Sequence, residues 1–330
     1  MTFKYNNVYL HEVSTVVGPY EAKGPIGTSF DKINDTLYCG EKTWEQAEVR
    51  LIQDSIDILL KKIKMKKEDI DVISSGDLQN QIAASCYAVE KYNIPFLGVY
   101  SACASNIESL IITSTMIDCK KINNAIISTS SHNMSSEKQF RNPTEYGAPK
   151  PSTATFTSTG AASAFLSNKK SDIKVEATTI GKVINKNQND PLNMGAVMAC
   201  AAADTIYRHL NDLNRKPSDY DLILTGDLGT FGKEILIDYM KEEYKIDISK
   251  NYNDTGTMLY DLDKQKEVLA GGSGPVCSAL VLYAYIIPLL KKKKIKKVLL
   301  AATGALFSPT FVYQHKNINS IAHAVSLEVV

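Results

Sequence analysis

Cys103 is the cysteine whose surroundings could support chemistry. It lies in the small-residue stretch Ser-Ala-Cys-Ala-Ser at 101–105, between an apolar segment and a stretch with a helical pattern. Backbone donors and the positive end of a helix favour a thiolate, which is how nucleophilic cysteines are activated. The same position also suits a small packed side chain. The sequence therefore leaves a reactive thiol and a packed residue as alternatives.

A nucleophilic cysteine also needs a base and a group that stabilises an oxyanion. His132, followed by Asn133, comes just after a predicted strand at 125–129, where it either lines a pocket or is an ordinary hydrogen-bonded histidine. His209 falls on a predicted helix, and His315 and His323 lie beyond the last clear strand. The second half of the chain thus offers no obvious base.

Two aspartates occupy matching positions just after predicted strands. Asp77 lies in Gly-Asp-Leu at 76–78, and Asp227 lies in Gly-Asp-Leu at 226–228. One interpretation is that each carboxylate caps a following helix. The other is that both supply acceptors or cation ligands at the rim of a shared cavity. A calcium-loop signature is absent, so we expect no dedicated metal site.

Residues 135–158 are rich in Ser, Thr and Pro and are predicted to be irregular. A segment of this length without regular structure is usually an active-site or contact loop. It carries Lys138 and Arg141, and an arginine can clamp a carboxylate with two parallel hydrogen bonds. An isolated loop arginine can equally be a structural tie.

Internal repeats indicate how these residues are positioned. Residues 44–78 align with residues 194–228 without a gap, which marks a duplicated half-domain. A weaker repeat pairs 95–133 with 268–306 and sets a glycine-rich elbow at 271–274 against the Cys103 elbow. We predict two halves, 1–169 and 170–330, with any pocket where Cys103 and Gly272 approach each other.

Local patterns predict an α/β protein. Thr43 and Gln46 form a capping-box pattern before a helix, and Trp44 falls on the apolar face of that helix, which predicts a core position. Strand, helix and strand recur in both halves. This order predicts parallel sheets with right-handed crossovers and helices on their faces.

Composition excludes several classes of protein. The chain has 330 residues, a formal charge of +1 and 44% hydrophobic residues, which does not fit a basic nucleic-acid reader. Its six cysteines are scattered, and its first residues lack the apolar core of a signal peptide, so we expect reduced thiols in the cytoplasm and no zinc site. The apolar run at 276–290 is too short for a transmembrane helix.

Lysine runs at 61–67, 120–121 and 291–297 occupy turns where a helix passes to a strand. Such turns lie at the amino ends of strands, opposite the edge where α/β sites form. They are either solvated turns or a basic face for peripheral contact with an anionic membrane.

Around Cys103 and in the order of its elements, nearly the whole chain resembles the thiolase superfamily of condensing enzymes. The resemblance implies a five-layered αβαβα fold, acyl transfer by the elbow cysteine and a homodimer. The superfamily's usual histidine, and its second histidine or asparagine, correspond here to Gly226 or Asp227 and to Gly272. The catalytic pair is therefore missing, and we expect no enzymatic turnover.

A narrower resemblance is carried by GDLQNQ, PFLGVYSACAS, SSHNMSSEKQFRNPTEYG, TGDLGTFG and GGSGPVCSA. These segments are similar to the stage V sporulation protein AD family of spore-forming Firmicutes. The resemblance implies binding of dipicolinic acid, alone or as its calcium chelate, for uptake into the developing spore. It also implies contact with proteins of the dipicolinate channel and a peripheral place, on the cytoplasmic side, at the forespore inner membrane.

For this function we expect no cofactor, although the ligand itself could carry calcium. The expected ligand-binding residues are Cys103, Ala104, Ser105, His132, Asn133, Lys138, Arg141, Asp77, Asp227, Gly272 and Ser273. The alternative function is an acyltransferase that uses acyl-coenzyme A or an acyl carrier protein, with Cys103 as nucleophile and His132 as base. A third possibility is a scaffold without a small-molecule ligand.

Overall fold

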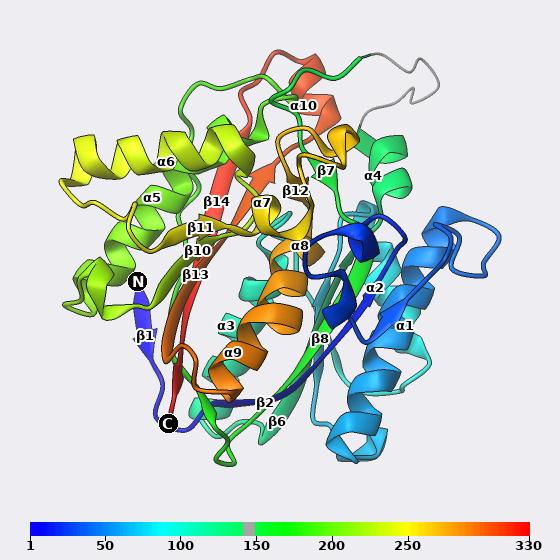
Figure 1. Ribbon diagram of the computed structural model, residues 1–330. Helices are drawn as coiled ribbons and strands as arrows, with labels where there is room; N and C mark the ends of the chain where they lie inside the picture. The colour runs from blue at the N-terminus through cyan, green and yellow to red at the C-terminus, as the bar shows by residue number, and fades with distance from the viewer. Residues whose placement is uncertain (141–148) are drawn as a thin grey trace.

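The computed structural model describes residues 1–140 and 149–330 (Figure 1). Its main sheet follows the strand order β11-β10-β13-β14-β9-β2-β8-β6-β4-β5. The strands of the first half are β2 (Tyr9–Val17), β4 (Ile73–Gly76), β5 (Phe96–Gly98), β6 (Asn124–Ser131) and β8 (Gly160–Ser167). Those of the second half are β9 (Ile173–Thr179), β10 (Leu222–Thr225), β11 (Tyr252–Asp254), β13 (Lys297–Leu306) and β14 (Asn319–Val329).

The two halves have the same strand order. If the five main strands of each half are numbered 1 to 5 along the chain, their order from the outer edge of the sheet to the junction between the halves is 3-2-4-5-1 in both. The junction is short, because β2 pairs with β9 only at Tyr9↔Lys174 and Leu10↔Ile173. Four short strands complete the described residues: β1 (Thr2–Lys4) pairs with β9, β3 (Lys32–Ile33) with β2, and β7 (Phe156–Thr157) with β12 (Gly272–Ser273).

Both halves are mixed sheets, so the prediction of wholly parallel sheets was wrong. Strand β4 is parallel to β5 and β6, and β10 is parallel to β11 and β13, as the helical crossovers require. The fourth and fifth strands of each half are antiparallel, however. The sequence repeats extend only as far as β6 and β13, so the returning strands β8 and β14 lie outside the repeated pattern.

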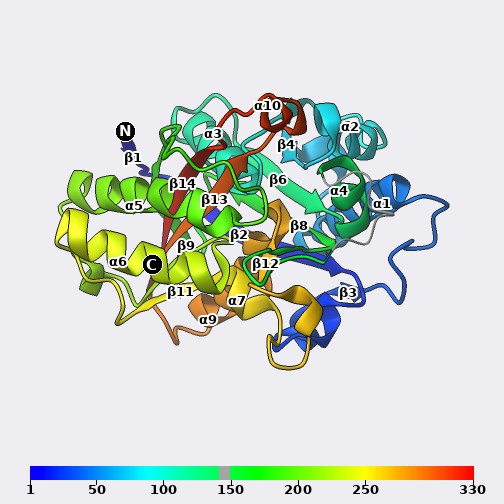
Figure 2. The ribbon, with the colours of Figure 1, turned by 90° about the horizontal axis from the view of Figure 1, so that it is seen from above.

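Helices form three layers around the two halves of the sheet (Figures 1 and 2). The outer layers are α1 (Trp44–Ile63) with α2 (Ala83–Glu90), and α5 (Met194–Asp212) with α6 (Gly229–Tyr244). The middle layer is α3 (Ser105–Asp118) with α8 (Pro275–Val281), which continues through a π-helical turn (Leu282–Ile286) into α9 (Ile287–Lys291). Three shorter helices are α4 (Asn133–Phe140), α7 (Thr255–Leu259) and α10 (Pro309–Tyr313). This is the predicted five-layered αβαβα arrangement.

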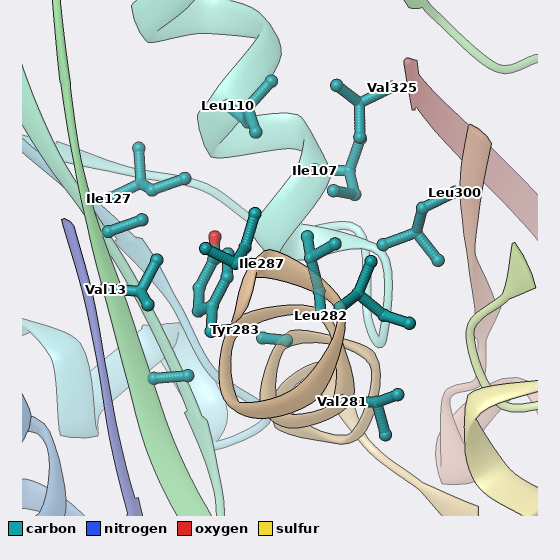
Figure 3. Packing of buried hydrophobic residues seen from close by; sticks show 14 of the residues in the cluster. Val13, Ile107, Leu110, Ile127, Val281, Leu282, Tyr283, Ile287, Leu300 and Val325 are labelled. Carbon is teal, nitrogen blue, oxygen red and sulfur yellow. The ribbon is translucent and has the colours of Figure 1, made fainter. Parts of the chain in front are cut away.

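The middle layer is the centre of the hydrophobic core. Ile107 and Leu110 of α3 face Leu282 and Tyr283 of the opposing helix, and Val325 of β14 closes one side (Figure 3). These helices are apolar on most faces because sheets lie on both sides of them. That explains the continuous apolar run at 276–290. No helix among the described residues is long and apolar enough to cross a membrane.

Two local predictions need correction. Thr43 does cap α1, since its side chain accepts the Gln46 N–H, but Trp44 is only half-buried and packs beside Tyr38. A residue in the first turn overhangs the end of the sheet, so the apolar face of the helix does not ensure burial there. The segment 135–158 is also less irregular than predicted, because its first residues belong to α4.

Candidate functional site

The elbow before α3 is held by its own backbone and by one serine. Ala102 has a left-handed φ of +49°, an unusual value for a residue with a side chain. Ser105 Oγ accepts the Ser101 N–H at 3.0 Å and donates to the Ala102 carbonyl at 2.7 Å. On the other side, Gly304 of β13 approaches so closely that an added Cβ would lie 2.3 Å from the Ser101 carbonyl oxygen. Cys103 is therefore held in one place.

Cys103 is half-buried in the wall of a cavity of about 300 Å³. The cavity lies beyond the carboxyl ends of β4, β10 and β13, between the two halves. Its apolar wall includes Leu78, Tyr100, Phe140, Met194, Met198 and Phe307. Its polar wall includes Ser136, Glu137, Thr157, Asp227 and Ser273. A space of this size and composition is typical of a site for one small molecule.

The thiol of Cys103 is hydrogen-bonded to the buried carboxyl of Asp227. Asp227 is itself held by three donors: the thiol, Thr303 Oγ1 at 2.5 Å from Oδ1, and the Gly274 N–H at 3.3 Å from Oδ2. Burial raises the pKa of Asp227 to about 7, although these donors work against the rise. The carboxyl thus changes its charge near neutral pH.

The Cys103 thiol stays protonated in this environment. Burial raises its pKa well above the usual value, and the charge of Asp227 and the hydrogen bond to it raise it further. The Gly274 N–H lowers the pKa, but that effect is smaller. The helix end favours a thiolate, but burial and the neighbouring carboxyl outweigh that effect, so of the two alternatives the packed, protonated thiol is favoured.

His132 does not line the cavity. It is fully buried, its Nε2 lies 2.7 Å from the Leu37 carbonyl oxygen, and its Nδ1 accepts the Met134 N–H at 3.2 Å. Burial lowers its pKa. Asn133 is tied in the same way, with its side-chain amide donating to the Thr157 carbonyl at 3.1 Å. Both are structural residues beneath the cavity wall.

Two other predicted contacts also lie away from the cavity. Lys138 is on the exposed side of α4, where its Nζ is 2.6 Å from Glu45 Oε1. Asp77 is buried and accepts the N–H groups of Gln79 and Ser85, so it caps the start of α2. Burial raises the pKa of Asp77 to about 7, with the charge of Glu48 as a second cause. Arg141 lies outside the described residues.

Of the small residues predicted to bind the ligand, one lines the cavity and three are buried behind its wall. Ser273 lines the cavity, next to Gly274, whose φ of +95° turns its N–H toward Asp227. Ala104 and Ser105 are fully buried behind the elbow. Gly272 is buried in β12, where a Cβ would lie 2.7 Å from the ring of Tyr260. Of the predicted set, the structure thus brings Cys103, Asp227 and Ser273 together at the cavity.

Three residues at this site were not among the expected ligand-binding residues: Glu137, Thr303 and Gly274, the last of which was expected only as part of the glycine-rich elbow. Glu137 lines the cavity and forms an ion pair of 2.9 Å with Lys150. Thr303 positions Asp227 from β13. A signal for Thr303 was available, because its strand is the partner of β10, which ends just before Asp227. Its neighbour Lys138 was predicted instead of Glu137, because a segment predicted to be irregular does not show which of its side chains faces a cavity.

The described residues give the cavity neither a histidine nor a cluster of side chains able to hold a metal ion. No described histidine lines it. His323 of β14 contacts the elbow that carries Cys103, with its Nε2 3.2 Å from Ser101 Oγ. Burial lowers the pKa of His323 to about 4. The described ranges also contain no cluster of three His, Cys, Asp or Glu side chains that could hold a metal ion.

Comparison with known proteins identifies the family. A family model described as Stage V sporulation protein AD (SpoVAD) matches residues 1–328. A relative with that description in Bacillus subtilis (strain 168) is 43% identical over 321 residues, covering 97% of this chain and 94% of the relative. The chain belongs to the stage V sporulation protein AD family. The resemblance carried by the five sequence segments is confirmed.

Solved structures of condensing enzymes share the fold. A 3-oxoacyl-[acyl-carrier-protein] synthase III from Aquifex aeolicus VF5 superposes with a TM-score of 0.58 at 10% identity and covers 97% of this chain and 99% of its own. A variant of OleA from Xanthomonas campestris superposes with a TM-score of 0.62 at 13% identity and covers 99% of both chains. The thiolase-like fold is thereby confirmed, and at such low identity the likeness extends to the fold alone.

Proposed function

We propose that this sporulation protein binds dipicolinate in the cavity beside Cys103 and passes it to proteins of the dipicolinate channel without chemical change. The observation that carries the proposal is the hydrogen bond from the Cys103 thiol to Asp227. Asp227 lies at the position where the resemblance to the thiolase superfamily leads us to expect a histidine base. A carboxylate beside a thiol opposes thiolate formation, so the cavity is suited to holding a ligand and poorly suited to acyl transfer.

The shape and polarity of the cavity support a flat aromatic acid. Tyr100, Phe140 and Phe307 offer aromatic surface, and ring pairs gain about 0.5–1.5 kcal/mol beyond the burial of their area. Ser136, Thr157 and Ser273 offer hydroxyl groups that could donate to carboxylate oxygens. Family membership supports a role in spore formation.

Charge favours the calcium chelate over the free dianion. Asp227 and Glu137 both line the cavity, and no described lysine, arginine or histidine lines it. Glu137 is paired with Lys150, so it is the ionised form of Asp227 that would oppose a bare dianion, whereas a chelate carries its own compensating cation. We therefore propose that calcium tightens binding, and that at low calcium the free acid binds better when Asp227 is protonated.

Isothermal titration with dipicolinate, with and without calcium, tests the proposal. Phe307→Ala removes one aromatic wall and is expected to weaken binding about tenfold, which corresponds to about 1.4 kcal/mol. Lys138→Ala is the matched control, because its side chain pairs with Glu45 on the surface and should not alter affinity. Absence of saturable binding by the parent protein would remove the proposal, as would equal affinities for the two variants.

Acyl transfer by Cys103 is the rival function, and the position of the thiol in the cavity is what favours it. Incubation with acetyl-coenzyme A followed by intact-mass measurement separates the two functions. We expect no added acyl group. An acetyl adduct that is lost in Cys103→Ala would establish the rival.

A further inference from the structure

A second hollow lies at the other end of the molecule from the Cys103 cavity. Its volume is about 1090 Å³, and its lining includes Lys62, Lys169, Lys170, Lys291 and His11. These residues come from the end of α1, the turn between β8 and β9, the end of α9 and the start of β2. The Cys103 cavity lies at the carboxyl ends of β4 and β10, so the lining residues place the two spaces at opposite ends of the sheets.

Positive charge in this hollow exceeds negative charge. Lys62 pairs with Asp31 at 2.6 Å and Lys291 pairs with Glu12 at 2.8 Å. Lys169 and Lys170 are exposed, and neither has an ion pair with a described residue. Where the chain is described, the carboxyl groups in the lining are Glu12 and Asp172, against four lysines. Lys169 and Lys170 therefore remain as cations available to a ligand, with Asp172 as the lining carboxyl that opposes an anion.

His11 adds a neutral hydrogen-bonding group to the hollow. Its Nε2 lies 2.8 Å from Ser167 Oγ, and it faces Lys169, Lys291 and Glu12. Burial is the main cause that lowers its pKa, so the imidazole is neutral at neutral pH. The positive charge of the hollow is consequently that of its lysines and persists across the neutral range.

The surrounding surface extends this charge. Exposed lysines occupy the neighbouring turns at 61–66, 120–121 and 292–296. The formal charge of the whole chain is only +1, so this concentration of lysine at one end is balanced by acidic residues elsewhere. An end of this kind attracts anions.

We propose that this hollow, between the two halves, binds a phosphate-bearing anion. Lysine is a compact, mobile point charge that suits phosphate, whereas arginine suits planar two-point recognition of carboxylates. Among the described residues Phe165 is the only aromatic ring besides His11 in the lining, which is not the succession of rings on which nucleic-acid bases stack. A phosphate group can come from a lipid headgroup or from a soluble phosphate ester.

Occupation of the hollow leaves the Cys103 cavity open. Because the two spaces lie at opposite ends of the sheets, an anion held by Lys169 and Lys170 does not reach the cavity that Phe307 lines. If the phosphate belongs to a lipid, the cavity faces away from the membrane surface. The site is thus independent of the ligand proposed for the cavity.

Two binding measurements with the full chain test the proposal. The first is co-sedimentation with vesicles of phosphatidylglycerol and phosphatidylcholine against vesicles of phosphatidylcholine alone, and the second is titration with glycerol 3-phosphate. Lys169→Ala/Lys170→Ala should weaken whichever binding occurs about tenfold or more. The matched control is Lys264→Ala/Lys266→Ala, which removes two exposed lysines that lie outside the hollow.

Each outcome either supports or overturns the proposed phosphate site. Binding to anionic vesicles alone supports the site with a lipid as its source of phosphate, and binding of glycerol 3-phosphate supports it with a soluble ester. In either case the affinity should fall as salt rises from 0.1 M toward 1 M, since the Debye length shrinks from about 10 Å to about 3 Å. Binding in neither assay, or equal loss in the two double variants, overturns the proposal.

Discussion

Replacing Asp227 with asparagine should make Cys103 more reactive. Above pH 7 the carboxyl is ionised, because burial raises its pKa only to about 7, and its charge then opposes a thiolate. Two unit charges about 4 Å apart at an effective dielectric constant of about 20 repel by about 4 kcal/mol. That energy equals about 3 pKa units of the thiol. The Asp227→Asn substitution removes the charge and leaves a side chain of the same shape.

The expected gain in alkylation rate is smaller than the gain in thiolate. A fall of about 3 units increases the thiolate fraction about a thousandfold at a pH below the thiol pKa, but a less basic thiolate is a weaker nucleophile, with a Brønsted coefficient of about 0.4–0.5. The net increase is therefore about 30- to 60-fold. Since the carboxyl of the parent is mostly protonated at pH 6, the ratio of variant to parent should be larger at pH 8 than at pH 6.

Iodoacetamide labelling followed by quantitative peptide mass spectrometry measures this rate. The peptide that contains Cys103 must be followed separately, because Cys86 and Cys119 are exposed and react on their own. Those two cysteines also serve as internal controls and should label equally in parent and variant. A Cys103 rate that is unchanged or lower in Asp227→Asn, with the internal controls constant, would refute the assignment of Asp227 as the group that keeps the thiol protonated.

Three further predictions concern the ligand, the core and the elbow. Affinity for calcium-free dipicolinate should fall between pH 6 and pH 8 as Asp227 ionises, and titration of Asp227→Asn should show a flatter profile. Leu110→Ala should lower the free energy of unfolding by about 2–5 kcal/mol in urea, because Leu110 is fully buried in the middle layer; the exposed Val183→Ala should change it by less than about 0.5 kcal/mol. Gly274→Ala should destabilise more than Gly40→Ala in thermal unfolding, because both glycines have positive φ but only at Gly274 would the new Cβ meet another atom, Ser131 Oγ at 2.5 Å.

The repeat in the sequence was sufficient to predict the layers of the fold. Residues 44–78 and 194–228 contain α1 with β4 and α5 with β10, and both helices lie on the outer faces. The direction of β8 and β14 was not predictable from these repeats. Those strands follow segments that differ in the two halves, one with α4 and β7 and one with α10. Whether two strands pair parallel or antiparallel depends on the end of the sheet from which the chain re-enters it. Local sequence patterns do not encode that.

The sequence predicted where the site lies better than it predicted which side chains line it. The Cys103 elbow was apparent because small residues at 101–105 permit a tight turn that few other sequences would form. His132 and Lys138 were misplaced for a common reason. Each is a polar residue that follows β6 in the sequence, but its side chain binds another part of the protein and not the cavity. His132 is hydrogen-bonded to the Leu37 carbonyl, and Lys138 forms an ion pair with Glu45.

Asp77 and Asp227 show how a duplicated residue acquires two roles. Both follow the second strand of their half, and burial raises the pKa of each to about 7. Asp77 accepts the N–H groups of Gln79 and Ser85, because the chain turns at once into α2. In the second half the corresponding capping role belongs to Asp254, which accepts the N–H groups of Leu228 and Gly229 at the start of α6. Asp227 is thereby released from capping and points to the Cys103 thiol, so the asymmetry between the halves, and not the repeat itself, creates the site.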